Sequence, residues 1–270
     1  MNMLSNWRRR NVMAKKQDRD AIDQEFIWGR QPVLDLLRHS PEKCLKLWIS
    51  ERAQSAFVNE FVTLAKSASV IFQKVPPSVL DEMCPKELHQ GVIARITAVE
   101  QIDLDIFLKS PYAQAKHILI VVLDHILDPH NIGAIVRTAE AAGAAAVIYP
   151  RRRSALPGGT VVKVSAGAAL RVPMIAVTNI AQTLLRLQEE GFWIVGLDHN
   201  AEQSFWEASY PKRTILVIGA EGEGLSRLVK ERCDLLFRIP MTGETGSLNA
   251  SVAAALGMFE WARAWGEQEQ

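Results

Sequence analysis

The chain of 270 residues is 48% hydrophobic and 23% charged, which allows a sizeable buried core in one large or two ordinary domains. Lysines and arginines number 31 against 30 acidic residues, so there is no global basic field and any contact with nucleic acid must rely on local patches. No apolar run approaches the roughly 18 residues of a membrane span, and no apolar segment follows the charged N-terminus, which predicts a soluble protein that enters no membrane.

The first 22 residues are polar and basic, and we expect them to form a flexible tail. Its cations are Arg8, Arg9, Arg10, Lys15, Lys16 and Arg19. A second basic group follows a strand-like run and consists of Arg151, Arg152 and Arg153. Contact with RNA phosphates and plain solvation are equally good interpretations of both groups.

Residues 23–99 alternate between strand-like and helical runs, which predicts a compact α/β domain. Pro32 begins an apolar spacing that is typical of a short amphipathic helix. Residues 100–116 hold charges, a Ser-Pro pair and no sustained period, so we expect a linker there. Within the domain we expect strands over 45–50, 70–74 and 91–96, a helix over 56–67 and a helical turn over 78–83.

Residues 117–270 predict a second α/β domain, built on a mostly parallel sheet that helices cover on both faces. Short, apolar and often β-branched runs alternate here with helical segments. The expected strands are 118–123, 145–149, 173–177, 193–197, 215–218 and 235–239, and the expected helices are 132–142, 161–169, 180–190, 226–232 and 248–265. Loops after such strands lie at the edge where open α/β sheets bind ligands.

The first candidate site segment follows the strand that ends at Asp124. Asn131 stands where the N-cap of an apolar-periodic helix is expected, and Arg137 can point from the second turn toward a neighbouring loop. The alternative is purely structural: Asn131 only caps the helix, and Arg137 only pairs with Glu140, three residues along. Taken alone, this segment favours the structural alternative.

The second segment carries glycines at positions 219, 222 and 224, in the order G-x-x-G-x-G, which is the wrong order for a dinucleotide fingerprint. Glu221 and Glu223 would repel a pyrophosphate at close range. A ligand without phosphate and with a positive centre fits better, and S-adenosylmethionine, a sulfonium, is one. The alternative is a tight turn whose glycines serve backbone conformation only.

The third segment opens the last helix. Ser247 suits an N-cap, and Asn249 in the first turn can send its amide toward the same pocket, while small residues after it allow close packing or a subunit contact. A capped, alanine-rich core helix explains the segment equally well when it is taken alone.

Together the three segments closely resemble the signature motifs of the SPOUT superfamily of methyltransferases, in its TrmH-like branch of RNA ribose 2'-O-methyltransferases. The resemblance spans residues 118–265, in order and spacing, and is greatest to the 23S rRNA (guanosine-2'-O-)-methyltransferase group. Residues 23–99, with Gly29-Arg30-Gln31-Pro32-Val33 near their start, are similar to the L30e-like RNA-binding domain of the ribosomal-RNA members. One departure is Glu244-Thr245-Gly246, where small or serine-rich residues are common, and it puts loop conformation in doubt.

The resemblance implies a trefoil knot in the C-terminal domain, an exception to the usual no-knot rule, and a homodimer whose active site is completed across the interface. It implies S-adenosylmethionine, bound in a bent shape, as the cofactor. The implied cofactor-binding residues are Leu197, Gly219, Glu221, Gly222, Gly224, Ile239, Met241, Ser247 and Leu248. The implied catalytic residues are Asn131, Arg137, Glu221, Ser247 and Asn249, and the RNA-binding candidates are Arg30, Arg137, Arg151, Arg152 and Arg153.

Methylation of a ribose 2'-hydroxyl requires the O–H to lose its proton as the oxygen attacks the methyl carbon in line. A guanidinium keeps its proton in proteins, so we assign Arg137 to electrostatic stabilisation and phosphate anchoring, and the general base stays open between Arg137 and another group. Ser247 and Asn249 would orient the hydroxyl. Glu221 would order the loops or hold Arg137.

We therefore expect an RNA 2'-O-ribose methyltransferase acting on a guanosine of large-subunit ribosomal RNA. The alternatives are a tRNA ribose methyltransferase of the same branch and a non-catalytic RNA-binding factor in ribosome assembly. The three cysteines lack C-x-x-C spacing and the six histidines lack metal spacing, so we expect neither a disulfide framework nor a metal site. Unpaired cysteines favour a reducing cytoplasm.

Overall fold

The structure, a computed structural model, describes residues 26–85, 88–152, 158–207, 209–243 and 246–265. The expected basic tail, Arg153 and residues 244–245 lie outside the described residues. The chain divides into two compact units. The first comprises the described residues up to Val99 and those over 158–167, and the second comprises the other described residues.

The first unit is built on a four-stranded sheet in the order β1-β4-β2-β3, in which β2 and β3 are parallel and the other pairs antiparallel. The strands are β1 Phe26–Trp28, β2 Cys44–Ser50, β3 Phe72–Val75 and β4 Val92–Ile96. Its helices are α2 Arg30–His39, α3 Ser55–Ser67, α4 Pro77–Met83 and α7 Gly159–Val164, with a 3-10 turn η1 at Pro41–Lys43. The sequence did not predict β1, because three residues are too few to show an alternating pattern and the strand forms by pairing with β4.

The second unit is built on a seven-stranded sheet in the order β7-β6-β5-β10-β8-β11-β9, and every paired strand is parallel to its neighbour. The strands are β5 Ile118–Leu123, β6 Ala146–Pro150, β7 Met174–Val177, β8 Trp193–Leu197, β9 Gln203–Ser204, β10 Arg213–Ile218 and β11 Leu235–Arg238. All six side chains of β5 are buried, as expected for a strand covered on both faces. The predicted parallel α/β architecture is therefore confirmed.

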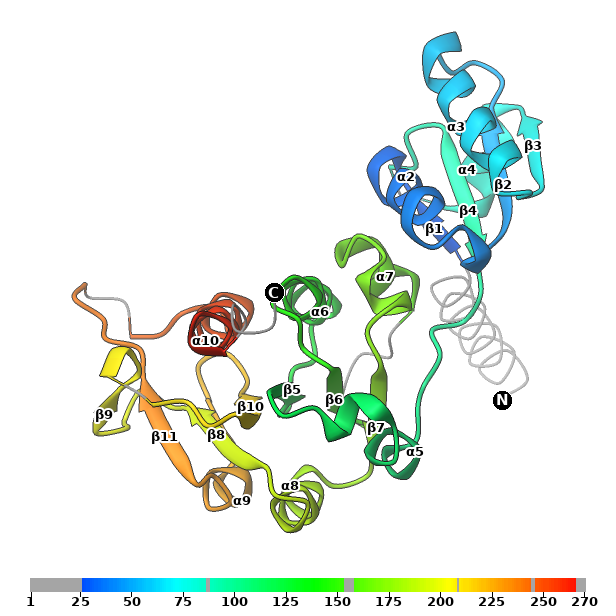
Figure 1. The fold of residues 1–270 in the computed structure, drawn as a ribbon. Helices are drawn as coiled ribbons and strands as arrows, with labels where there is room; N and C mark the ends of the chain where they lie inside the picture. The colour runs from blue at the N-terminus through cyan, green and yellow to red at the C-terminus, as the bar shows by residue number, and fades with distance from the viewer. Residues whose placement is uncertain (1–25, 86–87, 153–157, 208, 244–245, 266–270) are drawn as a thin grey trace, which may run out of the picture. The chain divides into compact units, whose positions relative to one another are not determined.

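Helices cover both faces of this sheet: α6 and α10 lie on one side, and α5, α8 and α9 on the other (Figure 1). Their bounds are α5 Leu104–Leu108, α6 Pro129–Ala141, α8 Ile180–Glu189, α9 Arg227–Lys230 and α10 Ala250–Trp265, with 3-10 turns η2 Pro111–Gln114, η3 Ala168–Leu170 and η4 Phe205–Glu207. The parallel strands all end at the same edge, so the loops that follow β5, β8, β10 and β11 are gathered there.

The segment expected to be a linker, residues 100–116, instead forms part of the second unit. It carries α5, whose Phe107 and Leu108 are buried in the core of that unit, and Ile102 donates its N–H to the Met174 carbonyl at 2.9 Å. The helix is a single short turn between charged residues, so its apolar side chains are too few to produce a visible period.

Two helix starts differ from the expectation. The N-cap of α6 is Asp128, whose carboxylate accepts the His130 N–H at 2.9 Å, and Pro129 follows it, so Asn131 lies inside the first turn. At α10 the capping side chain belongs to Asn249, which accepts the Ser251 N–H at 2.9 Å, and not to Ser247. Asn131 and Ser247 are therefore not the capping residues, and their side chains are available at the strand ends.

Candidate functional site

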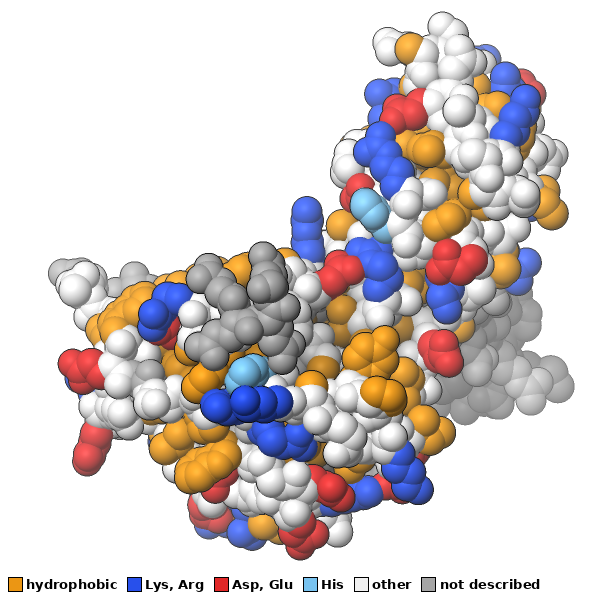
Figure 2. Space-filling model, in the orientation of Figure 1, with side chains coloured by type: hydrophobic (Ala, Val, Ile, Leu, Met, Phe, Trp, Pro, Cys, Tyr) orange, Lys and Arg blue, Asp and Glu red, His pale blue; other side chains and the backbone are white. Residues whose placement is uncertain are grey.

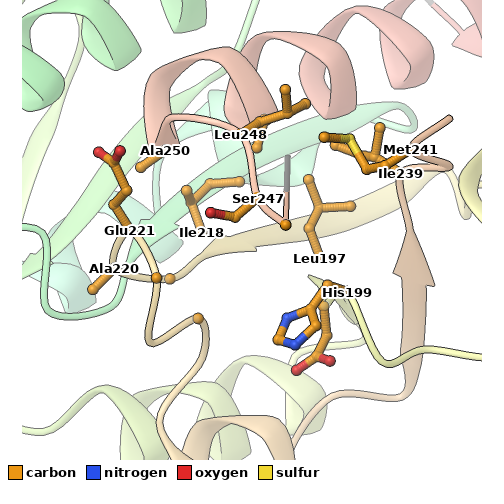
Figure 3. Close-up of a pocket in the computed structure, with 16 residues that line it drawn as sticks. Leu197, His199, Ile218, Ala220, Glu221, Ile239, Met241, Ser247, Leu248 and Ala250 are labelled. Atoms are coloured by element: carbon orange, nitrogen blue, oxygen red, sulfur yellow. The ribbon is translucent and has the colours of Figure 1, made fainter. Parts of the chain in front are cut away.

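A pocket lies at the carboxyl ends of β8, β10 and β11, next to the start of α10 (Figure 3). Leu197, Ile239 and Met241 lie on one side of it, whereas Glu221 stands on the other side, beyond Ser247. The pocket brings together every residue predicted to bind a cofactor, namely Leu197, Gly219, Glu221, Gly222, Gly224, Ile239, Met241, Ser247 and Leu248. No lysine or arginine is among the described residues that line it.

The wall after β10 is a closed glycine loop over residues 219–225. Ala220 and Gly224 exchange backbone hydrogen bonds of 3.1 and 2.8 Å across its base. A Cβ at Gly219 would lie 2.2 Å from the carbonyl carbon of Gly224, so only glycine allows the two stems to approach this closely. Gly222 and Gly224 have φ values of 79° and 70°, in the left-handed region that glycine favours. The loop is therefore held in one conformation by its backbone.

One amide joins the three candidate segments. The Nδ2 of Asn249 donates to Asn131 Oδ1 at 3.0 Å and to Glu221 Oε2 at 3.2 Å. Its Oδ1 accepts the backbone N–H and the hydroxyl of Ser251, at 2.9 and 2.6 Å. Residues more than a hundred positions apart in the chain thus form one polar cluster, and Glu221 belongs to both this cluster and the pocket.

Arg137 is exposed on α6 and makes no hydrogen bond or ion pair with any described residue. Its expected structural partner is taken: the Glu140 carboxylate is held by Arg171, whose Nη2 donates at 2.8 Å. The Arg137–Glu140 pairing considered from the sequence is therefore wrong. The structure also pairs Glu221 with Asn249 rather than with Arg137. An unpaired guanidinium is available to an anionic ligand.

Two pocket residues with polar side chains, Asp198 and His199, were not predicted from the sequence, and they directly follow β8. Asp198 forms an ion pair with Lys230 at 2.9 Å and accepts the Asn200 N–H at 2.8 Å. Burial favours the neutral carboxyl, but the Lys230 and Asn200 hydrogen bonds outweigh it and hold the pKa of Asp198 below its ordinary value. Asp198 and His199 could have been identified from the sequence, because they directly follow a predicted strand.

The candidate RNA-binding arginines lie in both units. In the first unit Arg30 opens α2, donates its backbone N–H to Gln90 Oε1 at 2.8 Å and places its guanidinium 4.3 Å from the centre of the Phe57 ring. In the second unit Arg151 and Arg152 are exposed after β6. Basic and acidic side chains are interspersed on the face that Figure 2 shows, so positive charge is available only locally.

The described residues hold neither a membrane-spanning helix nor a metal-binding cluster. None of the helices there is long and apolar enough to cross a membrane. No group of three or more histidine, cysteine, aspartate or glutamate side chains in that part of the chain is placed to hold a metal ion.

Comparison with protein families gives two matches. Residues 118–259 match the model of the SpoU rRNA Methylase family. Residues 26–102 match the model described as RNA 2'-O ribose methyltransferase substrate binding. The first match contains the strands, the glycine loop and the Asn131–Asn249–Glu221 cluster, and the second covers the sheet of the first unit.

Individual relatives agree with the family matches. The chain is 40% identical over 236 residues to the TrmH family protein YacO of Bacillus subtilis, whose name leaves tRNA and rRNA both open, covering 87% of this chain and 94% of YacO. It is 39% identical over 245 residues to the 23S rRNA (guanosine-2'-O-)-methyltransferase RlmB of Vibrio parahaemolyticus, covering 90% and 98%. The SpoU methyltransferase AviRb of Streptomyces viridochromogenes, solved with AdoMet, shares the fold with a TM-score of 0.71 at 24% identity, covering 89% of this chain and 90% of AviRb. The chain therefore belongs to the SpoU rRNA methylase family and is an RNA methyltransferase that carries the substrate-binding module of the 2'-O ribose enzymes.

Proposed function

We propose that this enzyme methylates the ribose 2'-hydroxyl of a guanosine in large-subunit ribosomal RNA, with S-adenosylmethionine as the methyl donor. The observation that carries the proposal is the convergence of three strand-end loops on one pocket, beside which the Asn249 amide joins Asn131 to Glu221. The guanosine and the ribosomal substrate rest on the likeness to RlmB. The SpoU rRNA Methylase match falls mostly in the second unit, and the substrate-binding match falls mostly in the first.

The pocket suits S-adenosylmethionine by its chemistry. Leu197, Ile239 and Leu248 offer an apolar surface for an adenine ring (Figure 3). No lysine or arginine among the described lining residues offsets the charge of a phosphate, and Glu221 supplies negative charge on the opposite side, where a sulfonium would be stabilised. The same fold in AviRb holds AdoMet. When bound, the cofactor supplies an electrophilic methyl carbon.

The chain's own residues must orient the 2'-hydroxyl and favour its loss of a proton. Asn249 holds both Asn131 and Glu221, so the Asn131 amide can orient a hydroxyl without reorganising. We assign that orientation to the two asparagines and to Ser247, which lines the pocket. Arg137 keeps its proton, so we assign it to stabilising the developing oxyanion and to anchoring a nearby phosphate.

We also propose that two copies of the chain form the working enzyme, with α10 at the interface. Val252 and Phe259, seven residues apart and therefore on one face of α10, are 47% and 51% exposed, with half-buried Ala255 and Leu256 between them. Figure 2 shows hydrophobic side chains on the surface near this helix. An apolar stripe of this kind on a helix beside the pocket fits a second copy that completes the active site.

Further parts of the proposal concern the path of the chain, the role of the first unit and the cellular compartment. We propose that α10 and the preceding loop pass through a trefoil knot, and that the first unit is L30e-like and binds RNA through Arg30. Arg151 and Arg152 would contact RNA phosphates near the methyl-transfer site. We propose that the enzyme acts in the cytoplasm. A non-catalytic assembly factor would not need the Asn131–Asn249–Glu221 cluster, which this chain retains.

The test is methylation of RNA in a strain that lacks the gene, read by primer extension at low nucleotide concentration on both ribosomal and transfer RNA. Loss of one 2'-O-methylguanosine from large-subunit RNA, restored by the wild-type gene, is the expected result. Loss of a tRNA mark would support instead the tRNA alternative that the name of YacO leaves open. No lost mark at all would support the assembly factor.

A further inference from the structure

Asp124, which the site described above does not use, contacts the backbone at both ends of the glycine loop. Its N–H donates to the carbonyl of Ile218, directly before Gly219, at 2.8 Å. Its carboxylate Oδ2 accepts the N–H of Ser226, directly after Leu225, at 2.7 Å. One residue at the end of β5 therefore fixes where the loop leaves β10 and where it enters α9.

The contact to Ser226 is strong because of its surroundings. Asp124 is 1% exposed, so water competes little for either hydrogen bond. The donor is the amide at the N-cap of α9, one of the helix-start N–H groups that have no partner within the helix. A carboxylate that accepts such an N–H makes a charge-assisted hydrogen bond, about twice as strong as a neutral one.

Between these two anchors the glycine loop has little freedom. Its base is closed by the Ala220–Gly224 hydrogen bonds, and Gly219 and Gly224 are in close backbone contact. The position of the loop in the pocket is then set by its two stems. Asp124 itself does not line the pocket, so any effect it has on a ligand must act through the loop.

We propose that Asp124 is a positioning residue for methyl transfer, which holds the glycine loop against S-adenosylmethionine by clamping its two stems. This inference rests on the proposed assignment of the pocket to that cofactor. Neither the sequence motifs nor the resemblance assigned a role to Asp124. Its effect appears first in cofactor affinity, because the loop it holds lines the cofactor pocket.

His125 completes the clamp. Its Nδ1 lies 2.6 Å from the other oxygen of Asp124, and its backbone has a φ of 59°, in the left-handed region. Each oxygen of Asp124 therefore has its own hydrogen-bond donor. An asparagine in the same place keeps the size but loses the charge: its oxygen can still accept the Ser226 N–H, as a neutral and weaker hydrogen bond, while its NH2 group faces the imidazole.

Asp124→Asn is therefore the test. Isothermal titration calorimetry with S-adenosylmethionine should show a dissociation constant raised about 10-fold, as expected when a charge-assisted hydrogen bond becomes a neutral one of about half its strength. The KM for RNA should stay within about twofold. Asp103→Asn is the matched control, because Asp103 also accepts a backbone N–H, at 2.8 Å, in the same unit, and asparagine caps α5 equally well.

The outcomes separate the two proposals. If the wild-type protein gives no heat with S-adenosylmethionine, the cofactor assignment of the pocket fails. If the wild type binds and folded Asp124→Asn binds equally well, the clamp is refuted. Should Asp124→Asn not fold, hydrogen exchange of the wild type decides: the clamp requires the Ser226 amide to be as protected as the amides of β10 without ligand, and exchange at the rate of an open loop would overturn it.

Discussion

Gly219→Ala provides the sharpest test of the cofactor pocket, because the consequence of one methyl group follows directly from the structure. The new Cβ would lie 2.2 Å from the carbonyl carbon, 2.3 Å from the carbonyl oxygen of Gly224 and 2.5 Å from the backbone nitrogen of Leu225. All three atoms are backbone, so no side chain can rotate away. Ordinary contact begins at 3.4 Å, and the far stem of the loop must therefore retreat by about 1.2 Å.

A retreat of that size moves the wall that contacts the cofactor. A misplacement of about 1 Å is enough to cost roughly 100-fold in a preorganised site, so we expect cofactor affinity and turnover to fall by at least that factor. The overpacking itself should destabilise the fold by about 1–3 kcal/mol. The protein should remain folded at 25 °C, because the strain is confined to a surface loop.

Two other glycines calibrate the measurement. Gly222→Ala meets no atom within 4 Å but keeps a φ of 79°, so it should cost only the backbone strain of about 1–2 kcal/mol. Gly243→Ala meets no atom within 4 Å and has no such φ, so it should behave as the wild type. Calorimetry with S-adenosylmethionine and thermal unfolding should show the largest loss for Gly219→Ala, a smaller loss for Gly222→Ala and none for Gly243→Ala. Binding by Gly219→Ala within threefold of the wild type would refute the close-approach argument.

Three further changes test the other parts of the site. Arg137→Ala should leave cofactor binding intact and lower methyl transfer about 100-fold or more, as for loss of an oxyanion donor, and unchanged turnover would exclude its catalytic role. Phe259→Glu should shift the protein to monomer in light scattering and abolish activity, whereas a monomeric wild type would contradict the dimer. Asp198→Asn should lower the melting temperature at pH 7. The folded-state pKa of Asp198 is depressed, so its carboxylate stabilises the fold above the unfolded pKa of about 3.9, and this stabilisation is lost as pH falls through the folded pKa. The difference in melting temperature between Asp198→Asn and the wild type should therefore disappear in acid. A difference that stays constant with pH would contradict the ion pair.

The sequence predicts the core of the fold because burial leaves a strong pattern. The run Ile118–Leu123 is apolar at every position, and each of those side chains is buried on a sheet covered on both faces. The glycine loop is also predictable, since Gly222 and Gly224 adopt left-handed backbone conformations. The same local signals fail for β1 and α5, which are short and owe their structure to pairing and burial rather than to periodicity.

The polar cluster was less accessible to sequence reasoning, because capping patterns are ambiguous over a few residues. Asp128 and Asn131 both suit an N-cap, as do Ser247 and Asn249, and only the structure shows that Asp128 and Asn249 take these places. Asn249 caps α10 with its oxygen and uses its nitrogen for Asn131 and Glu221. The position of Asn249 in the sequence does not by itself reveal both the capping role and the contacts to the other segments.

Strand order explains why these segments meet at all. In the sheet, β10 lies between β5 and β8, so the loop after β10 is next to the loop after β5, although about a hundred residues separate them in the chain. The direction in which successive strands are added changes at β5, where β6 and β7 extend one way and the later strands the other, and such a switch point leaves a crevice at the strand ends. Asp124 and Ser226 bridge the two adjacent loops there. The order of the strands, and not any motif by itself, thus brings the first and second segments together, and a local sequence pattern carries no information about that order.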